Sequence, residues 1–161
     1  MTLLVPMGPA FFGTYMPTEI AAYAEDNIAA GRGPREGALE RARSEIESLL
    51  PLGLATPEHH FFEIRPRVDA PTIGALWFGI EERHGLRSAF VYNVGIDAAW
   101  RRQGHALRAF EALDSMVRKL GLSHIGLHVF GHNPGAQALY AKLGYGVTGL
   151  NMVKHLGETR G

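Results

Sequence analysis

The first third of the chain carries apolar residues at helical spacing. In residues 17–30 they recur every three or four positions, Pro17 suits a first helical turn, and Gly31 follows as a stop. Residues 34–50 show a clearer apolar stripe, with charged residues mostly off it: Leu39, Ala42, Ile46, Leu49 and Leu50. The pattern predicts two amphipathic helices, preceded by a short strand at residues 3–5.

The middle of the chain changes to shorter runs that are typical of strands. Apolar and aromatic residues are frequent in 61–65, 72–80 and 88–97, and the connections between these runs contain Pro, Gly and Asp. Helical spacing then returns in residues 103–120, which Gly121 closes. These segments predict antiparallel hairpins followed by a helix.

The last third alternates strand and helix. Residues 124–130 predict a strand, and Asn133-Pro134 opens a helix with Asn as N-cap and Pro at the first helical position. Gly144 ends this helix, and residues 145–155 predict a last strand, which two further glycines weaken. The whole order predicts a single domain over residues 1–161, of the α/β (α+β) class, with a mixed, mostly antiparallel sheet and helices on both faces.

Composition narrows the function classes. The 161 residues are 46% apolar and 20% charged, and Lys plus Arg (16) balances Asp plus Glu (16), so bulk charge favours neither nucleic acid nor an anionic membrane as partner. The absence of cysteine excludes disulfides, thiolate zinc sites and a cysteine nucleophile. No carboxylate completes a set of metal ligands with any of the eight histidines, so no metal site is expected. The first residues lack a basic segment and a long apolar run, which favours a cytoplasmic protein.

The stretch between the third strand run and the following helix has the composition of an anion-binding site. A basic loop leads directly into a helix, and helix starts carry unpaired N–H groups and partial positive charge. Gly104 has no Cβ, so a phosphate can approach the backbone closely. The candidate binding residues are Arg101, Arg102, Gln103, Gly104, His105, Ala106 and Leu107. The same stretch also fits a surface turn with two solvated arginines.

Two motifs give the chain a resemblance to a known family. The residues R-x-x-G-x-A at 101–106 resemble the Q/R-x-x-G-x-G/A signature of the GNAT acetyltransferase superfamily. The residues NPGAQALYAKLGY at 133–145 resemble its second signature, N-x-x-A-x-x-L-Y-x-x-x-G-F/Y. The match is strongest over residues 88–155, the expected acetyl-CoA-binding core. Residues 1–58 form an N-terminal helical part, and the chain resembles an uncharacterised bacterial subgroup along most of its length.

The resemblance implies an activity and a cosubstrate. It implies an acetyl-CoA-dependent N-acetyltransferase, in which the loop amides bind the pyrophosphate of coenzyme A. The acetyl group would pass by direct attack to a primary amine of a small molecule or peptide. Dimers are common in the family, so a homodimer is compatible with the resemblance.

The resemblance also implies roles for five further residues. Val94, Gly95 and Ile96 would pair with the pantetheine arm through their backbone, and an N–H at Val94 or Gly95 would stabilise the oxyanion. Asn133 would contact the arm or its phosphate end, and Tyr140 would act as general acid toward the leaving thiolate. The sequence pattern alone is also compatible with structural roles. Residues 94–96 would then be a core strand, Asn133 a helix N-cap and Tyr140 a core tyrosine.

The general base has no clear candidate in the sequence. The strand run offers Tyr92 and Asn93 where a carboxylate is common in the family. The alternatives are His60, Glu63, Glu81 and Glu82, or a reaction without a base if the acceptor amine has a low pKa.

Two other functions remain open at this point. The missing strand carboxylate is compatible with a non-catalytic acyl-CoA-binding module on the same fold. The basic loop alone is compatible with an unrelated phosphate- or nucleotide-binding module.

Overall fold

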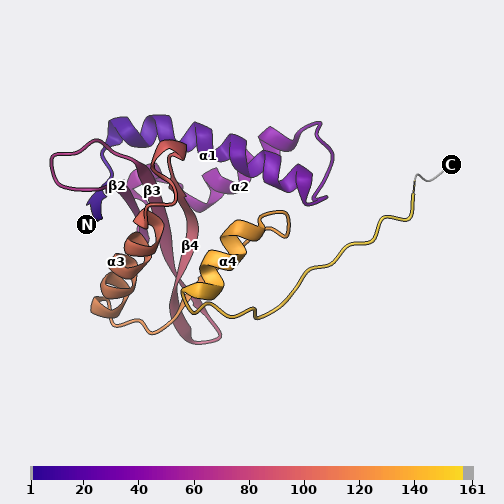
Figure 1. Cartoon of the computed structure of the whole chain (residues 1–161). Helices are drawn as coiled ribbons and strands as arrows, with labels where there is room; N and C mark the ends of the chain where they lie inside the picture. Colours follow the sequence, from indigo (N-terminus) through magenta and orange to yellow (C-terminus); the bar gives the residue numbers. More distant parts are fainter. Residues whose placement is uncertain (1, 158–161) are drawn as a thin grey trace.

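The computed structural model describes residues 2–157, and Figure 1 shows their arrangement. The elements, in chain order, are β1 (Leu3–Pro6), α1 (Pro9–Ala29), α2 (Ala38–Leu49), a 3₁₀ turn (Gly53–Ala55), β2 (His59–Arg65), β3 (Gly74–Arg83), β4 (Leu86–Ile96), a second 3₁₀ turn (Ala98–Trp100), α3 (His105–Lys119), β5 (Ile125–Leu127) and α4 (Pro134–Lys142). None of the helices in this part of the chain is long and apolar enough to cross a membrane.

The strands form one mixed sheet in the order β1-β2-β3-β4-β5. The first four strands pair antiparallel with their neighbours, and β5 pairs with β4 in parallel. Helices α1 and α2 cover one face of the sheet, while α3 packs on the other (Figure 1). The predicted fold class, a mostly antiparallel sheet between helices, is therefore confirmed.

The two faces of β3 hold two separate parts of the core. Because side chains alternate along a strand, Leu76 and Phe78 pack with Phe110 of α3, whereas Trp77 packs with the α1–α2 side around Ile20. Phe78 and Leu76 are fully buried and Trp77 is nearly so. The sheet is thus held rigidly between the helices, and β4 and its following loop are positioned from both sides.

The first helix is longer than predicted. It begins at Pro9 rather than at residue 17, so Pro17 lies inside α1 and not in its first turn. A proline inside a helix lacks the N–H that would bond to the preceding turn and costs about 3 kcal/mol. The additional turns place four large side chains against the α1–α2 core, which offsets that cost: Phe11, Phe12, Tyr15 and Met16.

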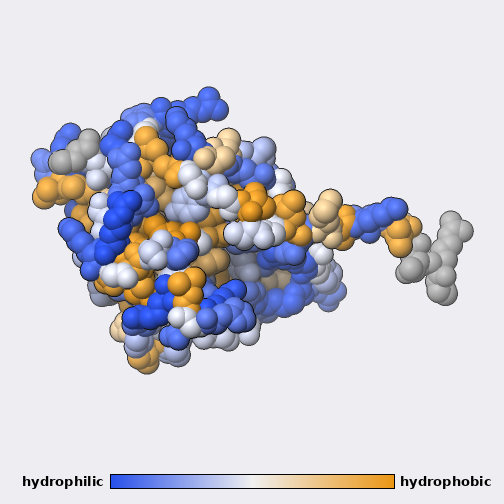
Figure 2. All heavy atoms as spheres, turned by 90° about the horizontal axis from the view of Figure 1, so that it is seen from below, coloured by the Kyte–Doolittle hydropathy of each residue, from blue (hydrophilic) through white to orange (hydrophobic). Residues whose placement is uncertain are grey.

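The predicted last strand does not form in the described part of the chain. After α4, Gly144 turns at φ +96° and Tyr145 packs on Phe110, with 6.0 Å between their ring centroids. Residues 146–157 then leave the body as an extended segment without strand pairing, and Figures 1 and 2 show it projecting from the molecule. The prediction at 145–155 was wrong: this segment projects away from the free edge of β5, and no strand pairs with it among the described residues (Figure 1).

Candidate active site

The loop after β4 presents an open helix N-terminus. Gly104 is the N-cap of α3 with φ +82°, and no side chain caps this end. The first intrahelical bond is donated by the Arg108 N–H to the Gly104 carbonyl, at 3.1 Å. The N–H groups of the preceding residues of the helix therefore have no acceptor in the turn and are available to an anion.

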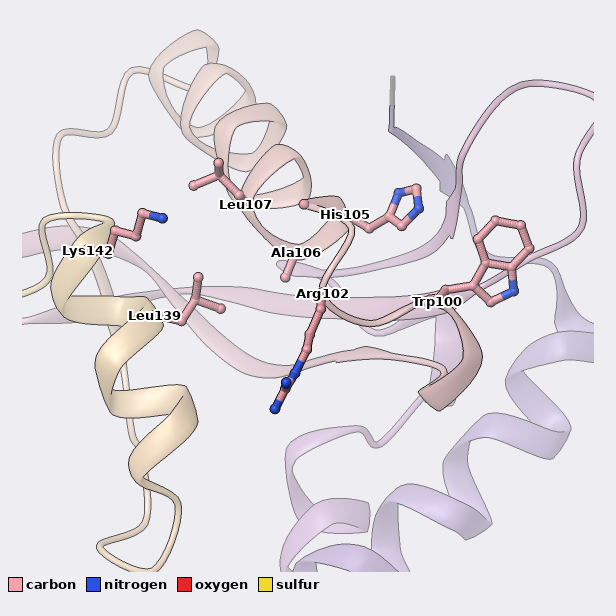
Figure 3. Close-up of a pocket in the computed structure, with 8 residues that line it drawn as sticks. Trp100, Arg102, His105, Ala106, Leu107, Leu139 and Lys142 are labelled. Carbon is pink, nitrogen blue, oxygen red and sulfur yellow. The ribbon is translucent and has the colours of Figure 1, made fainter.

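A cavity of about 340 Å³ lies beside this helix start (Figure 3). It is lined by residues of the loop, of α3 and of α4: Trp100, Arg102, Gly104, His105, Ala106, Leu107, Leu139 and Lys142. In Figure 3 the Arg102 side chain extends between the loop and α4, and Lys142 projects from the last turn of α4. The cavity thus adds two cationic side chains to the positive end of a helix. The sequence motifs did not indicate Lys142, since only the packing of α4 brings it here.

Two of the predicted loop residues shape the loop rather than line the cavity. The Arg101 Nε donates to the Ile96 carbonyl at 2.8 Å, which ties the loop to the end of β4. The Gln103 side chain donates to the Ala99 carbonyl at 3.4 Å, and Arg108 donates to the Gln103 carbonyl at 2.9 Å. These bonds hold the backbone that presents the amides.

His105 contributes backbone, not its imidazole, to the cavity. Figure 3 shows the ring turned away from Arg102. The ring is buried, and the hydroxyl of Thr2, the residue before β1, lies 3.1 Å from its Nδ1. Burial, and then the charge of Arg108, lowers the pKa of His105. The Arg108 guanidinium lies 3.2 Å from the same Nδ1 and can only donate, so this nitrogen is unprotonated and the imidazole is neutral.

The strand before the loop has a free edge. β5 pairs with β4 only from Ala89 to Val91 and ends at Leu127 rather than at the predicted residue 130. At this point the register between β3 and β4 shifts, with Trp77 opposite Asn93 and Phe78 opposite Val91, so β4 contains a bulge. Residues 92–96 of β4 therefore have no strand partner on the β5 side in the described part of the chain.

Backbone alternation decides which groups face this free edge. The Asp97 N–H donates to the Ile73 carbonyl at 2.7 Å. Because backbone groups point to alternate sides along a strand, the N–H and C=O of Asn93 and Gly95 also face β3. Val94 and Ile96 therefore turn their N–H and C=O toward the open side, where Arg101 already occupies the Ile96 carbonyl. Of the two predicted oxyanion donors, this geometry favours the Val94 N–H over that of Gly95.

The glycine that a close strand approach requires at this end of the sheet is Gly74 rather than Gly95. A Cβ placed at Gly74 would lie 2.2 Å from the Gly95 carbonyl oxygen, so the two strands pass closely there. Gly95 itself is exposed and has open space where its own side chain would be. The bulge lies earlier in β4, at Tyr92.

Helix α4 carries the two remaining predicted residues. The Asn133 Oδ1 accepts from the Ala136 N–H at 3.3 Å, which confirms the predicted N-cap. The cavity beside the loop is lined by the opposite end of this nine-residue helix, about 13 Å away, so Asn133 is not among its residues. Tyr140 is half-buried, 5.6 Å from Phe110 between ring centroids, and burial raises its pKa. The phenol is therefore protonated at neutral pH and able to donate.

The alternative bases predicted from sequence have other roles. Burial alone would raise the pKa of Glu63, but hydrogen bonds from Thr72, Arg65 and the Gly8 N–H outweigh it and hold that pKa low. Glu81 pairs with Arg83 near the β3–β4 hairpin, and Glu82 lies in the same turn region. His60 stacks on Phe78 with 4.9 Å between ring centroids. Burial, and then the charge of Glu81, raises the pKa of Tyr92 at the β4 bulge, so Glu81 is the one of these four whose charge acts on the bulge residue.

Comparison with known proteins agrees with this geometry. The acetyltransferase (GNAT) family model matches residues 32–145. The chain is 34% identical to the uncharacterised N-acetyltransferase YycN of Bacillus subtilis (strain 168), over 96% of this chain and 98% of that protein. It is 32% identical to the uncharacterised N-acetyltransferase YdgE of the same organism, over 90% of this chain and 92% of that protein. The crystal structure of YycN superposes with a TM-score of 0.92, covering 98% of this chain and all of the other.

The chain belongs to the GNAT acetyltransferase family. It is an acetyltransferase, built on the fold that the YycN structure shares.

Proposed function

We propose that this acetyltransferase uses acetyl-CoA and transfers the acetyl group to a primary amine of a small molecule or peptide. The observation that carries the proposal is the uncapped start of α3, which opens beside the unpaired edge of β4. A diphosphate bound by the amides of residues 104–107, with Arg102 and Lys142 nearby, would be held at a helix N-terminus. The pantetheine arm would then follow residues 94–96 toward the bulge.

The geometry supports a direct transfer. The amine lone pair attacks the thioester carbonyl carbon, and the negative charge that develops on the oxygen is stabilised by the Val94 N–H. Collapse of the tetrahedral intermediate breaks the carbon–sulfur bond. The leaving thiolate takes the proton of the Tyr140 hydroxyl, while the proton of the attacking amine goes to a base.

A thiol-release assay tests this function. Acetyl-CoA is supplied with amino acids, peptides, polyamines and aminoglycosides in turn, and binding is measured in parallel. We expect acetyl-CoA to bind and free thiol to appear with at least one class of amine. Binding without release for every amine would favour the acyl-CoA-binding module instead. Stabilisation by ATP or a dinucleotide, without binding of acetyl-CoA, would favour the nucleotide-binding module.

The projecting C-terminal segment supports a homodimer. Its large apolar side chains are 72–91% exposed: Val147, Leu150, Met152, Val153 and Leu156. Apolar exposure of this kind is typical of an interaction surface. β5 ends the sheet with a free edge in the described part of the chain, so each copy offers both an extended segment and an edge to pair with it. Two copies that exchange these segments would close with twofold symmetry.

Charged residues in this segment should break the dimer. Leu150 and Met152 lie two residues apart and so share one face of the extended chain. We expect the wild type to have the mass of a dimer in light scattering, and the double variant Leu150→Asp/Met152→Asp to have the mass of a monomer. The matched control, Glu111→Asp/Arg118→Lys on α3, should remain dimeric. A monomeric wild type, or a double variant that stays dimeric, would contradict the exchange.

A further inference from the structure

The proposed reaction leaves one role without a residue, because β4 carries no carboxylate to accept the proton of the amine. Asn93 occupies the strand position at the bulge, and its Oδ1 accepts a hydrogen bond from the Tyr15 hydroxyl at 2.7 Å. This bond fixes one point of α1 directly beside the bulge. The N-terminal helix is therefore part of the surroundings of the reacting group.

A second contact fixes the other end of the same helix. Asp26 Oδ1 lies 2.9 Å from His132 Nε2, in the segment between β5 and α4. At 3.6 residues per turn, Tyr15, Glu19 and Asp26 project from α1 within about 40° of one another. Tyr15 contacts β4, and Asp26 contacts the segment after β5. Glu19 lies between these two residues on the same face of α1, so it projects toward the space where β4 and β5 diverge.

The surroundings of Glu19 suit a base. The side chain is half-buried. No hydrogen bond or ion pair engages its carboxylate in the described part of the chain, in contrast to Glu63. Burial, and then the negative charge of Asp26, raises the pKa of Glu19 to about 7. A carboxylate that titrates near the working pH is both present in its basic form and able to hold a proton.

The other charged and titratable groups around this face come from several elements. They include Tyr15, Tyr23 and Asp26 on α1, Arg32 after it, His59 on β2, Glu81 on β3, Tyr92 on β4, and His128 and His132 after β5. Arg32 Nη2 lies 3.3 Å from His128 Nε2, and its guanidinium stacks 5.0 Å from the Phe130 ring centroid. Among these groups, Asp26 is the one whose charge acts on Glu19.

We propose that Glu19 is the general base of the acetyl transfer, placed by α1 rather than by the central strand. The amine nitrogen forms its bond to the acetyl carbon, and the Glu19 carboxylate takes the proton that this nitrogen loses, directly or through one water. The carbon–sulfur bond breaks, and the thiolate is protonated by Tyr140. The assignment rests on the proposed function and adds to it the residue that receives the proton.

Replacing Glu19 by glutamine tests the assignment with the best acceptor found in the thiol-release assay. We expect kcat to fall about 100-fold or more, which is the usual contribution of a general base. The limb of the pH profile of kcat/KM that rises through about pH 7 should disappear, and the Kd for acetyl-CoA should stay within about twofold of wild type. Glu25→Gln is the matched control, because Glu25 is an exposed residue of α1 that pairs with Arg35. An active Glu19→Gln variant with an unchanged pH profile would overturn the proposal.

A direct titration separates this proposal from the proposed function. The carboxyl carbon of Glu19, followed by NMR in the free protein, should titrate with a midpoint near 7 and needs no acceptor amine. A midpoint near the ordinary value of glutamate, about 4.3, would overturn the assignment. If the wild type binds no acetyl-CoA, the proposed function fails. If it transfers acetyl groups and Glu19→Gln does so equally well, the Glu19 assignment alone fails.

Discussion

Replacement of Gly104 by valine is expected to weaken acetyl-CoA binding about 100-fold or more. Gly104 has φ +82°, a conformation that a β-branched residue adopts only with strain. Its Cβ would lie 2.6 Å from Arg108 Nη1, and Arg108 in turn holds Thr2 and the Gln103 carbonyl. The Arg108 side chain can move aside, but the strained φ would shift the start of α3, and the amides would no longer converge on one anion. Each hydrogen bond from a backbone amide to the charged diphosphate contributes about 1.5 kcal/mol, so the loss of two raises the Kd roughly 100-fold.

A second glycine separates binding from general strain. Gly85 lies in the β3–β4 turn with a similar φ of +80° and open space around it. We expect Gly85→Val to lower the free energy of unfolding while the Kd for acetyl-CoA, measured by calorimetry, stays close to wild type. If Gly104→Val bound acetyl-CoA as tightly as wild type, the helix start would not be the phosphate site.

Replacement of Tyr140 by phenylalanine is expected to lower kcat about 100-fold and to leave the Kd for acetyl-CoA within twofold. The phenol supplies the proton that the thiolate takes, and general acid catalysis typically contributes a factor of this size. Its ring packs with Phe110 and Tyr145, and phenylalanine preserves those contacts. Steady-state thiol release and calorimetry measure the two quantities separately.

Tyr145→Phe is the matched control for this prediction. Burial, followed by the charges of Asp114 and Tyr140, raises the pKa of Tyr145 to about 12. Its hydroxyl is buried without a hydrogen-bond partner, so its removal should cost no stability. Loss of turnover in Tyr145→Phe with full activity in Tyr140→Phe would transfer the role to the neighbouring tyrosine. Full activity in both variants would remove tyrosine from the mechanism.

Local signals were enough to predict much of the fold and the loop. The change from strand to helix around Gly104 and the N-cap at Asn133 depend on neighbouring residues only, and both are found as predicted. The start of α1 was missed because Pro17 is a strong local signal for a helix start. Packing of aromatic residues from the preceding turns overrode that signal.

The errors elsewhere have a common physical cause, which is dependence on distant parts of the chain. The segment after Tyr145 has strand-like residues, but it projects away from the free edge of β5 and so does not pair with it (Figure 1). Lys142 reaches the cavity only because α4 packs beside α3. The face of α1 that carries Glu19 is oriented by contacts of its neighbours Tyr15 and Asp26 with Asn93 and His132, far along the chain. No spacing in the sequence relates these residues to the loop at 101–107.

A crystal structure of the protein with acetyl-CoA would test the central claim most directly. We expect the pyrophosphate within hydrogen-bond distance of the amides at residues 104–107. The thioester carbonyl should lie at the β4 bulge near the Val94 N–H, and the pantetheine arm along residues 94–96. A cosubstrate bound with its pyrophosphate away from the start of α3, or with its acetyl group outside the gap between β4 and β5, would contradict the account.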